Sequence, residues 1–447
     1  MKNSVAMVSL GCPKNLVDSE NMLALIKEAN LQIINTYSEA EVIIINTCGF
    51  IESAQEESIN TILEMAQYKK DGKCKVLIVV GCLVQKYQKE LKREIPEIDA
   101  FLGTDSYHEI VETINRTLNR EQIIKVKKDH AREYCELPRA IISPKPYAYL
   151  RIAEGCDNFC TYCAIPQIRG PFRSRPIENI IREANYLVSQ GVKEIILVAQ
   201  DISHYGKDIY GKIQLVPLLR ELAGITELRW IRLLYCYPNN FSDELIEIIK
   251  TEPKICKYID LPLQHADDSI LRKMGRQITQ ADIRNLILKL RANIPEIVIR
   301  STFIVGFPGE TEDNFINLLN FLNEMKLERV GAFLYSKEQN TPAAKMNGQV
   351  HKNTKKRRLK QLMERQYQIL LEQHQKYIGK IIVVQVDEFL EENNDLWVCR
   401  SMGEAPEIDP MILVYYPQDL YPGQLLEVRI THLKDYDLIG EIHRELT

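Results

Sequence analysis

Three apolar runs near the start of the chain alternate with segments of helical periodicity. The runs cover Ser4–Leu10, Glu41–Asn46 and Lys73–Val80, and after each one the apolar residues recur every three or four positions. Unbroken β-branched runs between helices are typical of strands that are buried on both faces of a parallel sheet. The first 120 residues are therefore predicted to form a parallel-sheet α/β domain.

A second series of βα units occupies the middle of the chain. Six candidate strands alternate with helical segments such as Ile177–Ser189, Ser242–Lys250 and Glu312–Met325, and Ser242 and Thr311 stand where helix N-caps are expected. Six βα units over about 190 residues fit an open (β/α)6 barrel, which is six of the eight units of a complete barrel. The strands are predicted at Tyr147–Ile152, Glu194–Ala199, Trp230–Leu234, Tyr258–Leu261, Ile297–Phe303 and Arg329–Leu334.

The last part of the chain predicts a small β-module. A helical pattern at Lys356–Tyr377 is followed by five short apolar runs separated by glycine and proline, which is typical of a small antiparallel β-barrel. The expected divisions are a domain at 1–120, a polar linker at 121–143, a core at 144–374 and a terminal barrel at 375–447. The barrel strands are predicted at Ile381–Val386, Leu396–Arg400, Ile412–Tyr416, Leu425–Thr431 and Ile439–Arg444.

Composition and charge narrow the class of protein. Hydrophobic residues make up 45% and charged residues 26%, and no apolar run approaches the roughly eighteen residues of a membrane span. The first apolar run reads as a strand and not as a signal peptide, and the chain contains 11 cysteines. Together these features favour the reducing cytoplasm, where the thiols would be free or bound to metal. The net charge of −4 gives no general attraction to nucleic acid.

The terminal barrel has a more extreme charge balance. Residues 376–447 contain 6 Lys or Arg and 14 Asp or Glu, a net charge of −8. Such a surface should repel phosphate backbones and attract a basic protein. The basic run Lys352–Lys360 could contact ribosomal RNA, but most runs of this kind are solvated helix faces.

The most informative motif is a Gly-Cys-Asp-Asn-Phe-Cys-Thr-Tyr-Cys stretch that contains Cys156, Cys160 and Cys163, here called the central triplet. Four-iron clusters normally take four cysteines, so three thiolates leave one iron open to a small molecule. A random chain of this composition would show the spacing with a probability on the order of one per cent. Zinc is the alternative, but the histidines on either side, His130 and His204, lie far away in the chain.

A second set of cysteines follows the N-terminal strands. Cys12, Cys48 and Cys82, here called the N-terminal triplet, each come two residues after a predicted strand. Neighbouring parallel strands end at one sheet edge, where ligands bind, so this register favours a second three-thiolate cluster that holds or supplies sulfur. The other interpretation is that they are ordinary buried cysteines. If both triplets hold clusters, we expect their open irons to face one pocket.

A few residues at strand ends are weak candidates for cofactor contacts. Tyr162 could stack on an adenine, and packing is an equally good interpretation. Gln200 and Asp201 follow the second barrel strand, where barrel active sites lie, although a solvated loop would look the same. Gly306 and Gly309 could admit a cofactor against the backbone or could serve only a tight turn.

Taken together, the motifs resemble the methylthiotransferases, which join a three-cysteine domain, a radical S-adenosylmethionine (SAM) partial barrel and a TRAM barrel. The resemblance covers essentially all 447 residues. The stretch Ser9–Glu20, with Pro-Lys-Asn after its cysteine, is similar to the branch that modifies an aspartate of ribosomal small-subunit protein twelve; the tRNA-modifying branch typically has Gln-Met-Asn there. Other similar blocks are Asn46–Ile51, Ala153–Gly170, Leu261–His265 and Phe303–Glu312.

The resemblance implies two [4Fe-4S] clusters, an auxiliary one on the N-terminal triplet and a SAM-binding one on the central triplet. It implies that a 5′-deoxyadenosyl radical removes hydrogen from the β-carbon of the aspartate, which then receives a methylthio group. No catalytic residue beyond the cluster ligands is expected. The expected partners are a basic ribosomal protein, bound partly by the acidic barrel, and an electron donor such as flavodoxin or ferredoxin. The enzyme is expected to act as a monomer and not to bind a membrane. The alternatives are tRNA adenosine methylthiolation and a non-catalytic iron–sulfur or RNA-binding scaffold.

Overall fold

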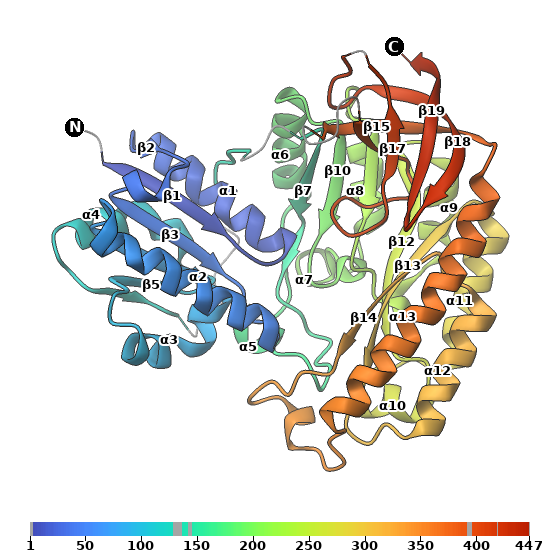
Figure 1. Ribbon diagram of the computed structural model, residues 1–447, viewed down its shortest axis with the longest axis horizontal. Helices are drawn as coiled ribbons and strands as arrows, with labels where there is room; N and C mark the ends of the chain where they lie inside the picture. The colour runs from blue at the N-terminus through green and yellow to red at the C-terminus, as the bar shows by residue number, and fades with distance from the viewer. Residues whose placement is uncertain (1–2, 128–135, 142–144, 391–395, 418, 447) are drawn as a thin grey trace.

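A computed structural model describes residues 3–127, 136–141, 145–390, 396–417 and 419–446. Part of the predicted linker, at 128–135 and 142–143, lies outside these ranges. The described chain forms a parallel α/β unit, an open barrel and a small closed barrel, in the predicted order (Figure 1). Within these ranges no helix is both long and apolar enough to cross a membrane.

The N-terminal unit is a six-stranded parallel sheet in the order β2-β1-β3-β4-β5-β6. Alternate residues of its central strands pack into two separate cores: Ile43 faces the layer of α2 and α3, whereas Ile44 faces α1 and α4. This three-layer arrangement confirms the predicted α/β fold. The elements are β1 (Ser4–Ser9), α1 (Pro13–Glu28), β2 (Gln32–Ile33), β3 (Val42–Thr47), α2 (Glu52–Asp71), β4 (Val76–Gly81), α3 (Cys82–Glu94), β5 (Ala100–Leu102), α4 (Ile110–Leu118) and β6 (Ile123–Lys125).

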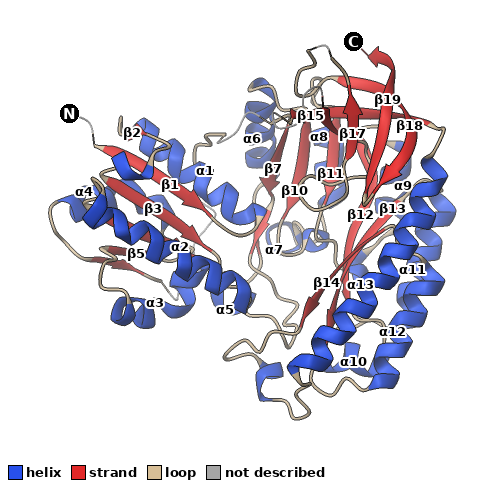
Figure 2. Cartoon of the chain, in the orientation of Figure 1, coloured by secondary structure: helices blue, strands red, loops and turns tan. Residues whose placement is uncertain are grey.

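The core is an open barrel of six parallel strands in the order β14-β13-β12-β11-β10-β7, with helices outside the sheet (Figure 2). All six strands occur where the sequence predicts them. The two predicted N-caps are also confirmed, because the Ser242 hydroxyl accepts from Leu245 N and Thr311 forms a capping box with Asn314. The strands are β7 (Tyr147–Arg151), β10 (Glu194–Val198), β11 (Trp230–Leu233), β12 (Ile255–Gln264), β13 (Val298–Val305) and β14 (Arg329–Leu334).

The helices of the core differ little from their predicted ranges. The long helix predicted at Lys356–Tyr377 runs from Lys352 to His374 and packs against β14. The core helices are α5 (Ile165–Ile168), α6 (Ile177–Ser189), α7 (Lys207–Tyr210), α8 (Leu215–Ala223), α9 (Asp243–Thr251), α10 (Asp268–Lys273), α11 (Gln280–Asn293), α12 (Glu312–Met325) and α13 (Lys352–His374).

The terminal unit is a closed five-stranded barrel in the order β15-β16-β17-β19-β18. The predicted small antiparallel barrel is confirmed except at one junction, where β17 pairs with β19 in parallel. An odd number of strands cannot alternate in direction all the way round a closed ring, so one parallel pair is unavoidable. The strands are β15 (Ile381–Phe389), β16 (Leu396–Arg400), β17 (Ile412–Tyr415), β18 (Leu425–Lys434) and β19 (Asp437–Leu446).

The terminal barrel covers the amino ends of the core strands (Figure 1). The buried carboxylate of Glu194, the first residue of β10, accepts from Arg232 Nε at 2.6 Å and from Arg400 Nη2 of the terminal barrel at 2.8 Å. Glu404 pairs with Arg329 at 3.0 Å. Part of the acidic charge counted in the sequence is therefore neutralised inside this junction and is not offered to a partner.

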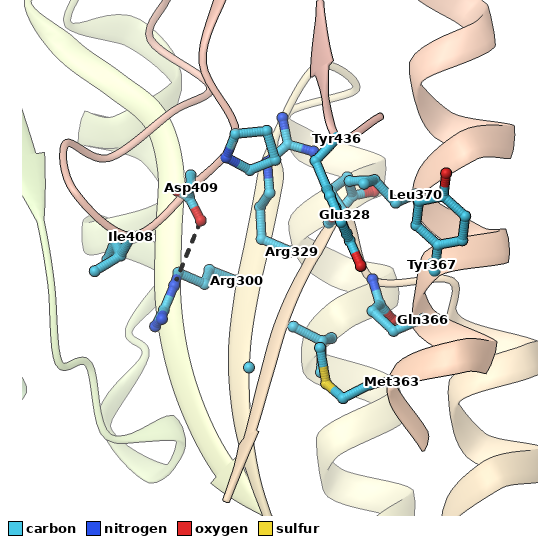
Figure 3. Close-up of a pocket in the computed structure, with 13 residues that line it drawn as sticks. Arg300, Glu328, Arg329, Met363, Gln366, Tyr367, Leu370, Ile408, Asp409 and Tyr436 are labelled. Carbon is cyan, nitrogen blue, oxygen red and sulfur yellow. Dashed lines mark hydrogen bonds and ion pairs between the residues drawn. The ribbon is translucent and has the colours of Figure 1, made fainter. Parts of the chain in front are cut away.

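The loop between β16 and β17 enters the same junction. Its Asp409 accepts from the Tyr258 hydroxyl at 2.6 Å and lies 3.5 Å from the Arg300 guanidinium. A cavity of about 190 Å³ remains between this loop, the amino ends of β13 and β14, and α13, with Tyr367 and Tyr436 on its wall (Figure 3). The terminal barrel is thus joined to the core through buried polar contacts and through an apolar cluster that includes Trp230 and Ala405, with a small gap beside them.

Candidate iron–sulfur and cofactor site

The carboxyl edges of the two parallel sheets meet where the cysteines lie. Lys14, at the start of α1, reaches into the core: its Nζ is 3.4 Å from the Ala199 carbonyl oxygen, just after β10, and 3.7 Å from the centre of the Tyr235 ring, after β11. Cys82 packs with Ile168 of α5. On another part of the interface, Glu338 accepts from Lys86 Nζ at 2.5 Å. Both sheets therefore present their ligand-binding edges to one interface.

The N-terminal triplet follows three neighbouring strands, β1, β3 and β4. Gly11 allows the loops that carry Cys12 and Cys48 to approach closely, because Gly11 has φ +91° and a Cβ there would lie 2.8 Å from Cys48 Cβ. Cys48 and Cys82 are buried, whereas Cys12 is half-buried. The adjacency of the three strands is as predicted from their order; that the three sulfurs hold a cluster stays a prediction.

The central triplet lies in the loop between β8 (Ala153–Glu154) and α5. Cys156 N donates to the Gly170 carbonyl at 3.1 Å, and Cys163 N donates to the Cys160 carbonyl at 3.0 Å, so the loop is closed at its base and coiled between its last two cysteines. Gly155 has no room for a side chain, because a Cβ would lie 1.9 Å from the Pro171 carbonyl oxygen. All three cysteines are half-buried, which leaves them open to a ligand.

Burial keeps most of these thiols protonated in the absence of iron. It raises the pKa of Cys82 to about 12 and of Cys163 to about 12, and that of Cys156 to about 11. Burial also raises the pKa of Cys48. Iron binds the thiolate, so cluster assembly at either triplet would release protons.

The side chains do not form a compact site for a single metal ion. Across the described ranges, no group of three His, Cys, Asp or Glu side chains is arranged to hold one ion, and the ten cysteines there form no disulfide. A structural zinc requires four ligands on one ion. In a four-iron cube each thiolate binds a different iron, so the sulfurs stand farther apart.

Each triplet has one buried arginine beside a sulfur. Arg169 Nη2 lies 3.5 Å from Cys82 Sγ, and Arg276 Nη1 lies 4.0 Å from Cys160 Sγ. Arg276 is held in place by a hydrogen bond of 2.6 Å to the Pro262 carbonyl and by the Tyr237 ring, whose centre is 4.1 Å from its guanidinium carbon. Hydrogen bonds and positive charge beside cluster sulfurs stabilise the more negative, reduced state.

Exchanging Arg276 for methionine is therefore expected to lower the midpoint potential of the central cluster. Loss of one charge-assisted contact should shift it by about 60 mV, the one-electron equivalent of about 1.4 kcal/mol. A redox titration followed by electron paramagnetic resonance measures the shift in protein matched for iron content. Arg272→Met, on the exposed side of α10, is the control. An unchanged potential in R276M would contradict the assigned role.

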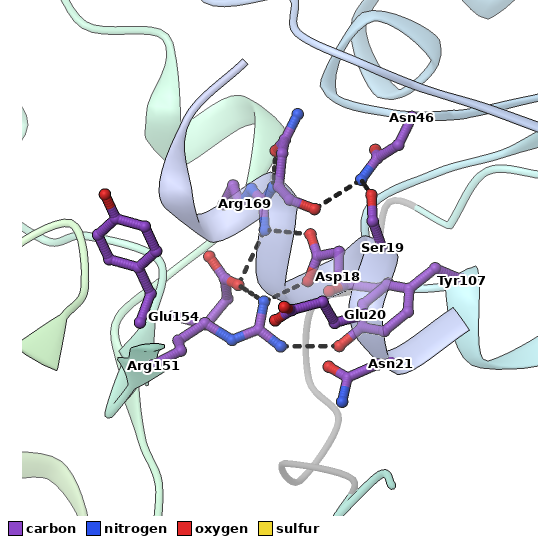
Figure 4. A network of polar contacts seen from close by, with 12 residues as sticks. Asp18, Ser19, Glu20, Asn21, Asn46, Tyr107, Arg151, Glu154 and Arg169 are labelled. Atoms are coloured by element: carbon purple, nitrogen blue, oxygen red, sulfur yellow. Dashed lines mark hydrogen bonds and ion pairs between the residues drawn. The ribbon is translucent and has the colours of Figure 1, made fainter. Parts of the chain in front are cut away.

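A buried charged network joins the two domains beside the cysteines (Figure 4). Asp18 of α1 pairs with Arg151 and, at 3.0 Å, with Arg169. Glu154, two residues before Cys156, accepts from Arg151 at 3.0 Å and from Arg169 at 2.9 Å. Burial favours the neutral acid, but Arg169 and Arg151 lower the pKa of Glu154 to about 2. Two carboxylates thus balance two guanidinium groups and fix the domains relative to each other.

Gln200 points into this network, as its strand-end position predicted. Its Nε2 donates to Glu154 at 2.7 Å, while its Oε1 is buried without a hydrogen-bond partner among the described residues. An unsatisfied acceptor at this edge suits an ammonium or hydroxyl donor of a bound cofactor such as SAM. Asp201 instead anchors its surroundings, accepting from Ser203 N at 2.9 Å and from Asn158 Nδ2 at 2.8 Å.

The turn itself accounts for Gly306 and Gly309. Both have positive φ, and Cβ atoms there would lie 2.3 Å from Lys355 Cγ and 2.6 Å from Lys273 Nζ. Two backbone N–H groups of the turn donate to the Glu310 carboxylate at 2.7 and 3.1 Å. The tight-turn interpretation explains both glycines, and their contact with a cofactor stays a prediction.

Tyr162 packs against a small apolar cluster with Phe307 and Tyr335, which supports the packing interpretation.

Sequence analysis did not single out Lys14, Arg169 or Arg276. Lys14 and Arg169 lie within sequence blocks that carry the family resemblance. Their position in the same blocks as the cysteines could have indicated that they belong to the site. Arg276 has no such signal, because more than a hundred residues separate it from Cys160.

A three-cysteine loop after the first strand of an open six-stranded barrel defines a radical SAM enzyme. The Radical SAM superfamily model matches residues 150–322, between a match to Uncharacterized protein family UPF0004 at 4–103 and one to the TRAM domain at 378–442. Enzymes of this class use SAM and a [4Fe-4S] cluster, and the half-buried central triplet and the unpartnered Gln200 Oε1 fit that pair.

Full-length relatives identify the family. The chain is 51% identical to ribosomal protein uS12 methylthiotransferase RimO of Desulforamulus reducens, with 98% of this chain and 99% of the relative covered. It is 48% identical to the protein of that name from Desulfitobacterium hafniense, covering 99% of each. The chain belongs to the RimO family.

Solved structures support the fold. The radical SAM methyltransferase TsrM of Kitasatospora setae, bound to cobalamin and a [4Fe-4S] cluster, aligns with a TM-score of 0.57 at 13% identity, covering 77% of each chain. The cobalamin-dependent SAM radical enzyme OxsB, in its apo form, aligns with a TM-score of 0.54 at 12% identity, covering 82% of this chain and 57% of OxsB. At these identities the likeness concerns the fold alone.

Proposed function

We propose that the protein is a radical SAM methylthiotransferase that adds a methylthio group to the β-carbon of an aspartate in ribosomal protein uS12. The observation that carries the proposal is that two groups of three cysteines border one interface, joined by Arg169. The full-length similarity to proteins named uS12 methylthiotransferase supports the substrate. One cysteine triplet alone would account for radical formation but not for a source of sulfur.

The proposed reaction assigns separate roles to the two cysteine triplets and to the arginines beside them. Cys156, Cys160 and Cys163 hold the SAM-binding cluster, which supplies a radical able to break a C–H bond that no side-chain acid or base can activate. Cys12, Cys48 and Cys82 would hold a second [4Fe-4S] cluster, which would hold or supply the transferred sulfur. Arg169 and Arg276 donate to sulfurs of the two triplets, and the charged network keeps the triplets in register and excludes water.

The partners follow from the proposed substrate. Exposed carboxylates on the terminal barrel, at Glu388, Asp419, Asp435 and Glu441, suit a basic ribosomal protein. A small reduced protein such as flavodoxin or ferredoxin provides the electron, and the enzyme works as a monomer. Because ribosomal proteins are made in the cytoplasm, the proposed activity places the enzyme there.

Mass spectrometry of cells with and without this chain tests the substrate. The proposal expects a gain of one SCH2 unit on uS12 and no chain-dependent gain in tRNA hydrolysates. A gain confined to tRNA adenosine would show that the substrate is tRNA and not uS12. A non-catalytic scaffold predicts neither gain, and also no 5′-deoxyadenosine when the reconstituted protein is given SAM and dithionite.

A further inference from the structure

Lys14 is a buried cation without a counter-ion. Only 7% of the residue is exposed. The contacts of its Nζ are the Ala199 carbonyl oxygen at 3.4 Å, a long hydrogen bond, and the Tyr235 ring. Throughout the described ranges, no carboxylate lies within ion-pair distance of this ammonium group. A buried ammonium that lacks an anionic partner is costly in free energy.

The other cations of the interface are matched. Arg151 and Arg169 share the carboxylates of Asp18 and Glu154. The negative charges that border the site are therefore already engaged by arginines, and Lys14 is left over. Lys14 differs from these arginines in that no carboxylate of the described residues pairs with it, which makes its ammonium group available to an anionic ligand.

Lys14 also connects the surroundings of the two triplets. It follows Cys12 by two residues, and Ala199, whose carbonyl it contacts, precedes Gln200, which reaches Glu154 at the base of the central cysteine loop. On the N-terminal side of Lys14, Gly11 is exposed and Cys12 is half-buried. An anion held by Lys14 would thus lie beside both triplets.

The residue beneath Lys14 is held in an unusual conformation. Tyr235 has φ +62°, which is a strained backbone conformation for a bulky side chain. Its backbone N–H donates to the Asp260 carboxylate at 3.0 Å, which fixes the bend. The bend turns the ring under the ammonium group, so the position of Lys14 is built into the end of β11.

We propose that Lys14 binds the side-chain carboxylate of the acceptor aspartate. This inference rests on the proposed function and adds the group that recognises the substrate. A carboxylate anchored on Lys14 holds the adjacent β-carbon one bond away from the anchor, between the two triplets. The same contact selects an acidic acceptor over an amide of the same shape, because an amide cannot complete the ion pair.

Peptide binding to the anaerobically reconstituted holoenzyme tests the inference. Two fluorescent peptides carry the uS12 acceptor loop, one with aspartate and the other with asparagine at the acceptor position, and fluorescence anisotropy gives each Kd. The parent enzyme should bind the aspartate peptide at least about tenfold more tightly. Lys14→Met should remove most of that preference and leave the Kd for the asparagine peptide nearly unchanged.

Matched variants keep the test decisive. Lys27→Met, at the exposed end of the same helix, should keep the preference and the activity of the parent. Where K14M lacks the iron content of the parent, Lys14→Gln and Lys14→Arg are compared instead; the arginine variant should keep part of the preference. Equal binding of both peptides by the parent, or an undiminished preference in the neutral variants, would overturn the role of Lys14. Failure of the parent to methylthiolate the aspartate peptide would instead count against the proposed function.

Discussion

Replacement of Cys12, Cys48 and Cys82 by alanine is expected to abolish methylthio transfer while 5′-deoxyadenosine formation continues. In the proposed function the radical depends on the central triplet, which lies on a separate loop of the core barrel, and the transferred sulfur depends on the N-terminal triplet. Iron should fall from about eight to about four per chain in the anaerobically reconstituted protein, because each cluster contains four irons. Iron analysis and chromatography of the SAM and peptide products measure the three effects together.

Cys74 offers a matched control for this experiment. Cys74 is buried two residues before β4, whereas Cys82 lies immediately after that strand, and burial raises the pKa of Cys74 to about 11. Cys74→Ala should keep both the iron content and the product. Four irons in the parent protein would remove the two-cluster interpretation, and methylthio transfer by the triple variant would show that sulfur comes from elsewhere.

Replacement of Glu194 by alanine is expected to be among the most destabilising single substitutions in the chain. Glu194 and Arg232 are fully buried, and the carboxylate also holds Arg400 of the terminal barrel. Its loss leaves two buried guanidinium groups short of negative charge, with Asp387 as the remaining carboxylate on Arg400. Removal of one partner from a buried ion pair costs about 3–5 kcal/mol.

Chemical denaturation and limited proteolysis between the core and the terminal barrel measure this effect. Glu227→Ala is the control, because Glu227 is 71% exposed and its pair with Lys193 spans 3.5 Å, so its loss should change stability by no more than about 0.5 kcal/mol. A loss below about 1 kcal/mol in E194A would show that the junction does not depend on this carboxylate.

The same group gives stability a defined pH dependence. Burial opposes ionisation of Glu194, but Arg232 and Arg400 hold its pKa below the ordinary value. A carboxylate with a lowered folded-state pKa stabilises the protein above its unfolded-state pKa, and that stabilisation is lost as the pH falls through the folded-state value. The parent should therefore lose stability in acid more steeply than Glu194→Gln does, as measured by denaturation at a series of pH values.

The fold was largely accessible from the sequence because its buried strands are continuous apolar runs and its helices carry recognisable caps. The short strands β2, β5 and β6 were missed, and β6 lies in the stretch predicted as a polar linker, since two or three residues show no periodicity. The parallel β17–β19 pair depends on how the barrel closes, which local pattern does not record. Of the site, strand ends located the cysteines. The partnership of Asp18 with Arg169 joins residues far apart in the chain and could not be predicted from either one.

The attachment of the terminal barrel has a consequence for how such enzymes can diversify. The barrel is fastened by Arg400 and by the loop that carries Asp409, at the end of the core strands opposite the cysteines. Exposed side chains of the barrel such as Glu388 and Glu441 are not among these contacts, so they can be exchanged without disturbing radical chemistry. A change of macromolecular target then requires only a new outer face on an unchanged anchor.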